Sequence, residues 1–309
     1  MTTRIFIDGA AGTTGLEIRD RLAGREEFEL IVLSDDRRKD EDARRDALHA
    51  ADIGILCLPD GAARDAVALV EGADTRIIDA SSAHRVAKGW TYGFPELIGH
   101  DAIAEAQFVS NPGCYPTGFL ALVAPLIKAA VLPAEWPYTV NAVSGYSGGG
   151  NALIDRFDDD QTIAFRAYGL ALTHKHLPEM KAYAGLTNEP VFSPSVVPAH
   201  RGMLVDVPLP LSAMPGATSA AFLESALTGH YAGSGVVHVH AHSQPPAEML
   251  VKQGAEPWDG LGLHVFTSED GAQARLIAML DNLGKGASGA AIQNLNIMCG
   301  LPETTGLRL

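Results

Sequence analysis

A cysteine in a turn is the side chain with the clearest chemical potential in this sequence. Cys114 stands in SNPGCYPTGF, residues 110–119, with Pro-Gly before it and Tyr-Pro after it. The apolar run that follows, YPTGFLALVAPL, predicts a helix that begins beside the thiol. A helix N-terminus favours a thiolate, because its N–H groups and dipole stabilise negative charge. Cys114 is therefore predicted to be a nucleophile.

The other two cysteines have different surroundings. Cys57 (GILCLP) and Cys299 (NIMCGL) lie in apolar runs, where a thiol packs as a small hydrophobic side chain. Three widely spaced cysteines form no disulfide framework, which indicates a reducing compartment and predicts a cytoplasmic protein.

A thiolate nucleophile needs an acid/base partner. The segment THKHLPEM, residues 173–180, offers His174 and His176 near a predicted helix start. At i and i+2 they cannot share one helical face, so one can serve the chemistry while the other binds or packs. Asn111 offers an amide N–H to a developing oxyanion.

A second group of histidines alternates along VHVHAH, residues 237–242. As a strand, this run would place His238, His240 and His242 on one face. No Cys, Asp or Glu nearby completes a metal-ligand set, which favours solvent-facing or interface histidines and predicts no metal.

Glycines follow the first predicted strand, RIFID (4–8), in the loop GAAGTTG (9–15). In a strand–loop–helix unit, such glycines allow a tight turn, a close backbone approach to a pyrophosphate and close helix packing. The loop predicts a dinucleotide site. The predicted cofactor-binding residues here are Gly9, Gly12, Thr13, Thr14 and Gly15.

A charged run, SDDRRKD, follows the second predicted strand, where the adenosine ribose would lie. Acids and bases are both present. Consecutive cations favour a 2′-phosphate, because guanidinium groups form bidentate bonds to it. We therefore predict NADP rather than NAD, with Ser34, Arg37 and Arg38 as cofactor-binding residues.

The elements that must position these residues fall into two patterns. Strands alternate with helices up to about residue 115, which predicts a Rossmann-type, doubly wound parallel sheet. Strand-like runs then follow one another closely, which predicts an α+β domain with a mostly antiparallel or mixed sheet. We expect an NADP-binding domain over 1–115, a catalytic and oligomerisation domain over 116–284, and a C-terminal helical segment, 285–309, that packs back on the first domain.

Composition limits the possible partners. The 309 residues carry a formal net charge of −14, which argues against nucleic acid as a partner. No stretch is apolar for long enough to span a membrane, and the N-terminus has no signal-peptide pattern. A cofactor domain with an activated cysteine points to attack of a thiolate on an acyl carbon, followed by hydride transfer at the resulting thioester.

Five motifs resemble those of one family. They are SNPGCYPTG, SGYSGGG (144–150), YGFPEL (92–97), HKHLPEM and QNLNIMCGLPETTGL (293–307). Together they resemble the N-acetyl-γ-glutamyl-phosphate reductases of arginine biosynthesis, in the compact second type. With the glycine loop, the resemblance covers nearly the whole chain.

The resemblance implies a role for each matching residue. Cys114 would take the acyl group and His174 would handle protons. The loop DASSAHR stands where the family often has an acidic and an aromatic residue before the arginine, and Arg85 would bind the substrate carboxylate. The remaining implied substrate-binding residues are Asn111, Ser144, Ser147, Gly148 and His176, and Asn294 would contact the cofactor.

The implied reaction is reduction of an acyl phosphate by NADPH through a cysteine thioester, in a homodimer or homotetramer. Three alternatives stay open. The substrate of a related semialdehyde dehydrogenase would be aspartyl phosphate or N-acetyl-aminoadipyl phosphate. A non-catalytic NADP-binding sensor or scaffold would need no thiolate, and a thiol hydrolase would need no glycine loop.

Overall fold

The computed structural model describes residues 2–217 and 219–309, and the chain divides into two compact units. The first unit comprises Met1–Gly113 and Ala287–Leu307. The second comprises Cys114–Gly286 with Arg308–Leu309.

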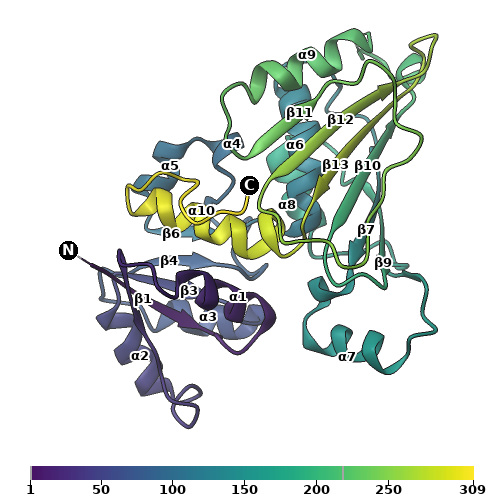
Figure 1. Ribbon diagram of the computed structural model, residues 1–309. Helices are drawn as coiled ribbons and strands as arrows, with labels where there is room; N and C mark the ends of the chain where they lie inside the picture. The colour runs from purple at the N-terminus through teal and green to yellow at the C-terminus, as the bar shows by residue number, and fades with distance from the viewer. Residues whose placement is uncertain (1, 218) are drawn as a thin grey trace. The chain divides into compact units, whose positions relative to one another are not determined.

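The first unit is built on a six-stranded sheet in the order β2-β1-β3-β4-β6-β5, in which all neighbouring strands are parallel (Figure 1). The chain passes from β1 to β2 on one side and to β3 on the other, so the strand order reverses between β1 and β3. Ligands of doubly wound sheets bind at such a switch point, beyond the carboxyl ends of the strands. The strands are β1 (Thr3–Asp8), β2 (Phe28–Ile31), β3 (Ile53–Leu56), β4 (Arg76–Asp79), β5 (Thr91–Tyr92) and β6 (Phe108–Ser110).

Helices cover both faces of this sheet, because successive strand residues point to opposite sides. Ile5 packs with Ile18 of α1 and Leu295 of α10, whereas its neighbour Phe6 packs with Leu48 of α2. The helices of the first unit are α1 (Thr13–Leu22), α2 (Glu41–Ala50), α3 (Asp60–Ala68), α4 (Pro95–Ile98), α5 (His100–Glu105) and α10 (Gly289–Met298).

The second unit is built on a seven-stranded mixed sheet in the order β11-β12-β13-β10-β7-β9-β8. The pairs β7–β9 and β11–β12 are parallel, and the other neighbouring pairs are antiparallel. The strands are β7 (Thr139–Gly145), β8 (Arg166–Ala167), β9 (Val191–Val197), β10 (Met203–Leu209), β11 (Val237–His240), β12 (Leu261–Thr267) and β13 (Ala274–Leu280).

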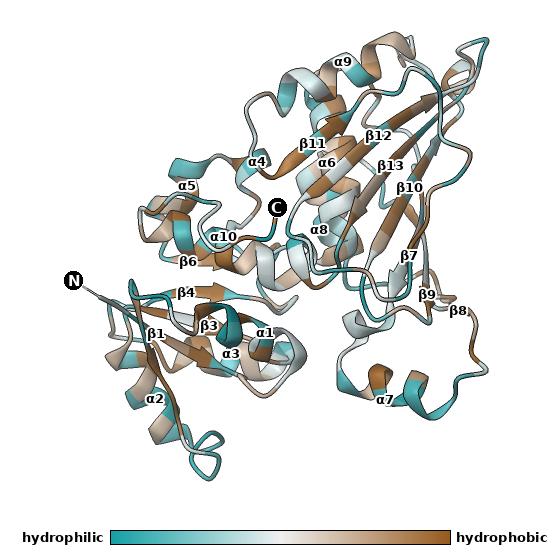
Figure 2. Ribbon diagram, in the orientation of Figure 1, coloured by the Kyte–Doolittle hydropathy of each residue, from teal (hydrophilic) through white to brown (hydrophobic). Residues whose placement is uncertain are grey.

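Helices α6, α8 and α9 lie on one face of this sheet (Figure 1). The central helix α6 is almost wholly buried, and Gly118 lets it approach Val205, since a Cβ there would lie 2.7 Å from that side chain. Along β10, buried and partly exposed residues alternate strictly, so the opposite face of the sheet is open in the protomer. The strands of the sheet are coloured largely apolar in Figure 2. The helices of the second unit are α6 (Cys114–Lys128), α7 (Asn151–Asp159), α8 (Leu177–Ala184) and α9 (Ala221–His230).

The predicted fold class is confirmed: a parallel doubly wound sheet is followed by an α+β unit with a mixed sheet. Four helices, α2, α4, α5 and α7, were not predicted. The sequence of α2 is mostly charged, but Ala43, Ala47 and Leu48 form a narrow apolar stripe that is buried. The side chain of Asp40 caps the helix by accepting from the backbone N–H of Ala43 at 2.7 Å. The sequence also predicts a helix over 218–229; residue 218 lies outside the described residues, and α9 is observed over Ala221–His230. No helix among the described residues has the length and apolar character to cross a membrane.

Candidate active site

The glycine loop connects β1 to α1 in the first unit. Gly9 has a φ of +88°, and a Cβ there would lie 2.3 Å from the carbonyl oxygen of Cys57, so the turn requires glycine. A Cβ on Gly15 would lie 2.4 Å from the Gly9 carbonyl oxygen, which shows how closely α1 approaches the loop. At Gly12 the nearest atom to a Cβ would be 3.6 Å away, so there is more room at this glycine.

The N-terminus of α1 is suited to an anion. Gly12 is its N-cap, and no side chain caps the helix. Thr13 and Thr14 form the start of the first turn. Helix N-termini bind phosphates through backbone N–H groups and the positive end of the helix dipole. The loop therefore fits the pyrophosphate of a dinucleotide.

The predicted 2′-phosphate residues lie in the turn after β2. The carbonyl oxygen of Ser34 accepts from the backbone N–H groups of Arg37 and Arg38 at 2.9 and 3.0 Å. Arg37 lies 4.0 Å from Asp40, and Arg38 lies 3.9 Å from Asp35. Exposed pairs at these distances are weak, so both guanidinium groups can turn toward a bound phosphate.

Asn294 on α10 has a buried acceptor suited to a ligand. Its Nδ2 donates to the carbonyl oxygen of Gly93 at 2.9 Å and to Oδ1 of Asn111 at 3.1 Å. These two acceptors fix the orientation of the amide. Among residues 2–217 and 219–309, its Oδ1 is buried and finds no hydrogen-bond partner. An N–H group such as that of a nicotinamide carboxamide would satisfy it.

Arg85 and Asn111 belong to the first unit. Arg85 is buried, and its Nε donates to the carbonyl oxygen of Asn111 at 3.0 Å. Its loop is fixed by a contact of 2.6 Å between Nδ1 of His84 and Oδ2 of Asp79. The side chain of Asn111 donates to the carbonyl oxygen of Ala287 at 2.9 Å. Their predicted roles toward the substrate stay predictions.

Cys114 is the first residue of α6, and it is partly buried. A π-helical turn, η3 (Gly284–Ser288), approaches it closely. A Cβ on Gly286 would lie 2.8 Å from Cβ and 3.3 Å from Cα of Cys114, so only a glycine fits against the cysteine. The backbone N–H of Gly286 donates to the carbonyl oxygen of Asp281 at 3.0 Å, which fixes this turn.

A cage of rings surrounds His174, with Tyr115 connecting it to the cysteine. The His174 ring lies 6.4 Å from Tyr115, 5.7 Å from Tyr168, 5.2 Å from Phe192 and 4.6 Å from His176, measured between ring centroids. The backbone N–H of His176 donates to Nδ1 of His174 at 3.2 Å. A neutral ring in this arrangement carries its proton on Nε2, which makes His174 a proton donor at that atom.

Two phenols complete the cage. The hydroxyl of Tyr168 donates to that of Tyr115 at 3.3 Å, and Tyr115 donates to the carbonyl oxygen of Ser195 at 3.2 Å. Burial raises the pKa of Tyr168 to about 12 and that of Tyr115 well above its usual value, and the charge of a nearby Cys114 thiolate contributes to both shifts. Both phenols are therefore protonated at neutral pH. His174 is thus in ring contact with Tyr115, the residue that follows Cys114.

The serine and glycine loop joins the same region. Ser144 and Ser147 are buried, and the hydroxyl of Ser144 donates to the carbonyl oxygen of Gly145 at 2.9 Å. Ser147 Oγ accepts from Nδ2 of Asn282 at 2.9 Å. A Cβ on Gly148 would lie 3.4 Å from the same Nδ2 and 3.7 Å from Ser144 Oγ. These groups provide several hydrogen-bonding atoms to a phosphoryl or acyl oxygen.

Five residues of this region were not predicted from the sequence: Tyr115, Tyr168, Phe192, Asn282 and Gly286. Tyr115 carried a signal, because it directly follows the cysteine in the turn motif. The others reach the site through long-range packing, and local sequence patterns give no indication of it.

The remaining thiols have environments that suppress reactivity. Burial, with the nearby carboxylates of Asp79 and Asp8, raises the pKa of Cys57 to about 12. Burial also raises the pKa of Cys299. Both thiols are protonated near neutral pH, so neither is a nucleophile.

The alternating histidines lie on β11 and just after it. Nε2 of His242 lies 2.8 Å from Nδ1 of His264 on β12, and the His240 and His264 rings stack with centroids 4.7 Å apart. Burial, with these neighbours, lowers the pKa of His264 to about 4. In the part of the chain that the structure describes, no three His, Cys, Asp or Glu residues are placed to hold a metal ion.

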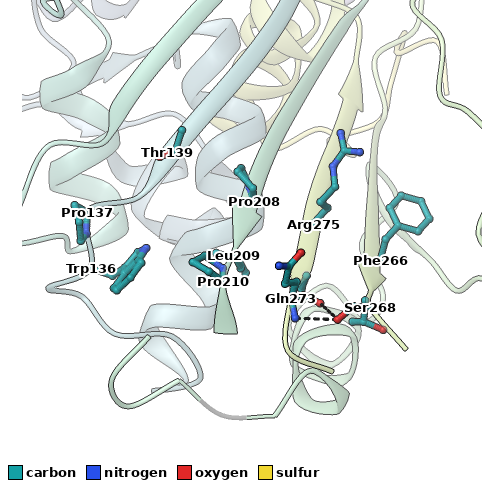
Figure 3. Close-up of a pocket in the computed structure, with 12 residues that line it drawn as sticks. Trp136, Pro137, Thr139, Pro208, Leu209, Pro210, Phe266, Ser268, Gln273 and Arg275 are labelled. Carbon is teal, nitrogen blue, oxygen red and sulfur yellow. Dashed lines mark hydrogen bonds between the residues drawn. The ribbon is translucent and has the colours of Figure 1, made fainter. Parts of the chain in front are cut away.

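A cavity of about 630 Å³ opens in the second unit (Figure 3). Trp136, Thr139, Pro208 and Arg275 are among the residues that line it, and none of the predicted site residues does. Thr139 begins β7 and Ser144 lies near its end, so the cavity lies at the opposite end of the strand from the serine loop.

Two family models match the chain. Residues 4–106 match the semialdehyde dehydrogenase NAD binding domain, and residues 114–282 match the semialdehyde dehydrogenase dimerisation domain. The structure is similar to aspartate semialdehyde dehydrogenase II from Vibrio cholerae, with a TM-score of 0.71 at 15% identity, over 97% of this chain and 99% of that one. A cofactor loop, a thiol at a helix start and these two domains define the semialdehyde dehydrogenase class.

Curated relatives are much closer in sequence. The chain is 51% identical to N-acetyl-gamma-glutamyl-phosphate reductase of Brucella ovis, over 97% of this chain and 100% of that protein. It is 48% identical to the protein of the same name in Trichormus variabilis, over 98% and 99%. The chain belongs to the N-acetyl-gamma-glutamyl-phosphate reductase family. The predicted family and a nicotinamide dinucleotide cofactor are confirmed.

Proposed function

We propose that the chain catalyses reduction of N-acetyl-γ-glutamyl phosphate by NADPH to N-acetylglutamate semialdehyde and phosphate, in arginine biosynthesis. The relatives named above carry the name of this activity. The structural observation that carries the proposal is Cys114 at the first residue of α6, beside the ring cage that holds His174. Reduction of an acyl phosphate through a thioester needs such a thiol, an acid/base group and a hydride donor.

The first step forms the thioester. The Sγ thiolate of Cys114 attacks the acyl carbon, the bond from that carbon to the phosphate oxygen breaks, and phosphate leaves. Ser144, Ser147 and the backbone at Gly148 are the donors that we assign to the phosphoryl and acyl oxygens. Asn111, Arg85 and His176 are assigned to the rest of the substrate, with Arg85 on its carboxylate.

The second step reduces the thioester. NADPH, when bound, supplies the hydride that is added to the thioester carbonyl carbon. His174 donates its Nε2 proton to the carbonyl oxygen, because its Nδ1 is engaged by the His176 backbone N–H. The thiohemiacetal then returns that proton to His174 as the C–S bond breaks, which releases the aldehyde and restores the Cys114 thiolate. The proton consumed overall is taken up by the departing phosphate.

Cofactor binding is assigned to residues 1–115 with 285–309, and catalysis with oligomerisation to 116–284. The glycine loop takes the pyrophosphate and Asn294 the nicotinamide. Ser34, Arg37 and Arg38 would select NADPH, because a charge-assisted bond to a 2′-phosphate contributes about 1.5–3 kcal/mol. The double substitution Arg37→Ala with Arg38→Ala should weaken NADPH binding about a hundredfold and leave NADH nearly unchanged. Equal losses of both cofactors would show that these arginines only form a solvated surface.

We assign a homodimer or homotetramer that forms through the second unit, whose match is a dimerisation domain. The open face of its sheet, where partly exposed residues of β10 alternate with buried ones, is the surface that supports this assignment. Light scattering over a range of protein concentrations measures the mass. A cytoplasmic enzyme is consistent with the absence of a disulfide among the three cysteines in the described part of the chain.

The function is tested by assays in the oxidising direction. N-acetylglutamate semialdehyde should reduce NADP only when phosphate is present, because phosphate must cleave the thioester. Aspartate semialdehyde and N-acetyl-aminoadipate semialdehyde serve as the competing substrates. Faster turnover of either competitor would replace the proposed substrate, and NADP reduction without phosphate would contradict the acyl phosphate chemistry.

A further inference from the structure

An ion pair between a buried carboxylate and a partly buried guanidinium group lies directly before the glycine loop. Asp8 is the last residue of β1 and is 4% exposed. Arg44, on α2, approaches it with Nε at 3.0 and 3.3 Å from the two carboxylate oxygens and with a second nitrogen, Nη2, at 2.8 Å. This is the fork geometry that makes arginine–carboxylate pairs strong and directional.

The place of this pair in the sheet relates it to the cofactor. Asp8 is aligned with Leu56 of β3, at the carboxyl edge where the strand order reverses. A dinucleotide binds beyond this edge, with its pyrophosphate at the glycine loop. An unpaired carboxylate at Asp8 would repel that pyrophosphate, and the repulsion would be strong because the group is buried. Arg44 removes this repulsion.

The same arginine lies close in the chain to the predicted 2′-phosphate residues. The backbone N–H of Arg44 donates to the carbonyl oxygen of Asp40, the N-cap of α2. Asp40 in turn lies 4.0 Å from Arg37. The ion pair therefore ties the end of β1 to the helix start that follows the basic turn.

We propose that Arg44 is a positioning residue of the cofactor site, with two effects. It neutralises Asp8 beside the pyrophosphate, and it holds the turn of Arg37 and Arg38 in register with the glycine loop. Arg44 thus determines dinucleotide affinity and the preference for a 2′-phosphate. This inference rests on the proposed use of NADPH.

The test compares Arg44→Met with Arg45→Met in the full-length protein. Arg45 is a matched control, because it is adjacent on α2 and its partners Glu41 and Asp42 are exposed. Dissociation constants for NADPH and NADH are measured by quenching of nicotinamide fluorescence, and kcat is measured at saturating NADPH. Arg44→Met should weaken NADPH by about tenfold or more, should weaken NADH less, and should change kcat by less than about twofold. Arg44→Lys should restore part of the affinity, since it supplies charge without the fork.

Other outcomes distinguish failure of the inference about Arg44 from failure of the proposed function. If wild type binds NADPH and Arg44→Met binds both cofactors as Arg45→Met does, the inference is wrong while the proposed function stands. If wild type binds neither cofactor, the proposed function fails and the inference fails with it. Should Arg44→Met not fold, Asp8→Asn with Arg44→Met removes both charges of the pair. That variant should recover NADH affinity without the preference for NADPH, and a retained preference would overturn the inference.

Discussion

Cys57 and Cys114 occupy similar places in the chain and have opposite surroundings. Each follows a strand of the parallel sheet and precedes a helix: Cys57 comes directly after β3, and Cys114 comes shortly after β6. Cys57 is partly buried, and desolvation of its thiol, with the nearby carboxylates of Asp79 and Asp8, raises its pKa to about 12. Cys114 starts its helix and contacts a glycine turn, next to a ring cage with a proton donor. The comparison shows that the residues packed around a strand-to-helix turn decide whether its thiol is inert or a nucleophile.

The largest expected effect comes from exchanging each thiol for a hydroxyl. Cys114→Ser should abolish nearly all turnover with cofactor binding intact, because an alkoxide is far harder to form than a thiolate. Cys57→Ser should retain turnover and lose about 1–2 kcal/mol of stability, as a hydroxyl enters an apolar site. Steady-state rates, NADPH titration and chemical unfolding check both variants. A Cys114→Ser enzyme with a tenth of the wild-type rate, an estimate far above the expected residual, contradicts the nucleophile assignment.

Substitutions of the two histidines of the cage, His174 and His176, should affect different kinetic parameters. Acid/base catalysis contributes about a hundredfold to ten-thousandfold, so His174→Asn should lower kcat by that order and flatten one limb of its pH profile. His176→Asn should change KM more than kcat. The measurement is kcat and KM from about pH 4.5 to about pH 8.5, a range of roughly two pH units either side of the ordinary histidine pKa of about 6.5. Equal effects of the two substitutions on kcat would contradict the assignment of acid/base catalysis to His174 and of substrate binding to His176.

Substitutions of two glycines test whether close packing distinguishes the turn around Cys114 from the turn around Cys57. Gly286→Ala places a methyl group against Cys114 and should displace the thiol, at a cost of about tenfold to a hundredfold in kcat. The control is Gly61→Ala in α3, the helix after Cys57, where a Cβ would meet no atom within 4 Å. It should leave kcat unchanged and slightly raise stability. If both alanines leave kcat unchanged, close contact with Gly286 does not position the thiol.

The smallest expected effect is on the pH dependence of stability, and it comes from burial of a basic side chain, His264, instead of an acidic thiol. Burial lowers the pKa of His264 to about 4, below its usual value of 6.5, so the unfolded chain binds the proton more readily. Stability should therefore be full above about pH 6.5 and fall by about 1–2 kcal/mol toward pH 4, after solvent screening. Urea unfolding at several pH values measures this slope. His264→Phe should flatten it, and an unchanged slope would assign the effect to other groups.

Local patterns predicted the parts of the molecule that local physics determines. The glycine loop and the turn around Cys114 follow from residues adjacent in the chain, and both sheets follow from apolar periodicity. Helix α2 was missed because Ala43, Ala47 and Leu48 form a narrow stripe within charged sequence. The cage of Tyr115, Tyr168 and Phe192 depends on how α6, the β8 segment and β9 pack, which no local pattern encodes.

Peptide mass spectrometry can detect whether Cys114 forms an acyl thioester. The protein is mixed with N-acetyl-γ-glutamyl phosphate without cofactor, quenched in acid and digested. We expect an N-acetylglutamyl group on the peptide that contains Cys114, its loss when NADPH is added before the quench, and no adduct in Cys114→Ser. An adduct on another residue, or no adduct in a preparation that turns over with NADPH, would show that the reaction does not pass through a Cys114 thioester.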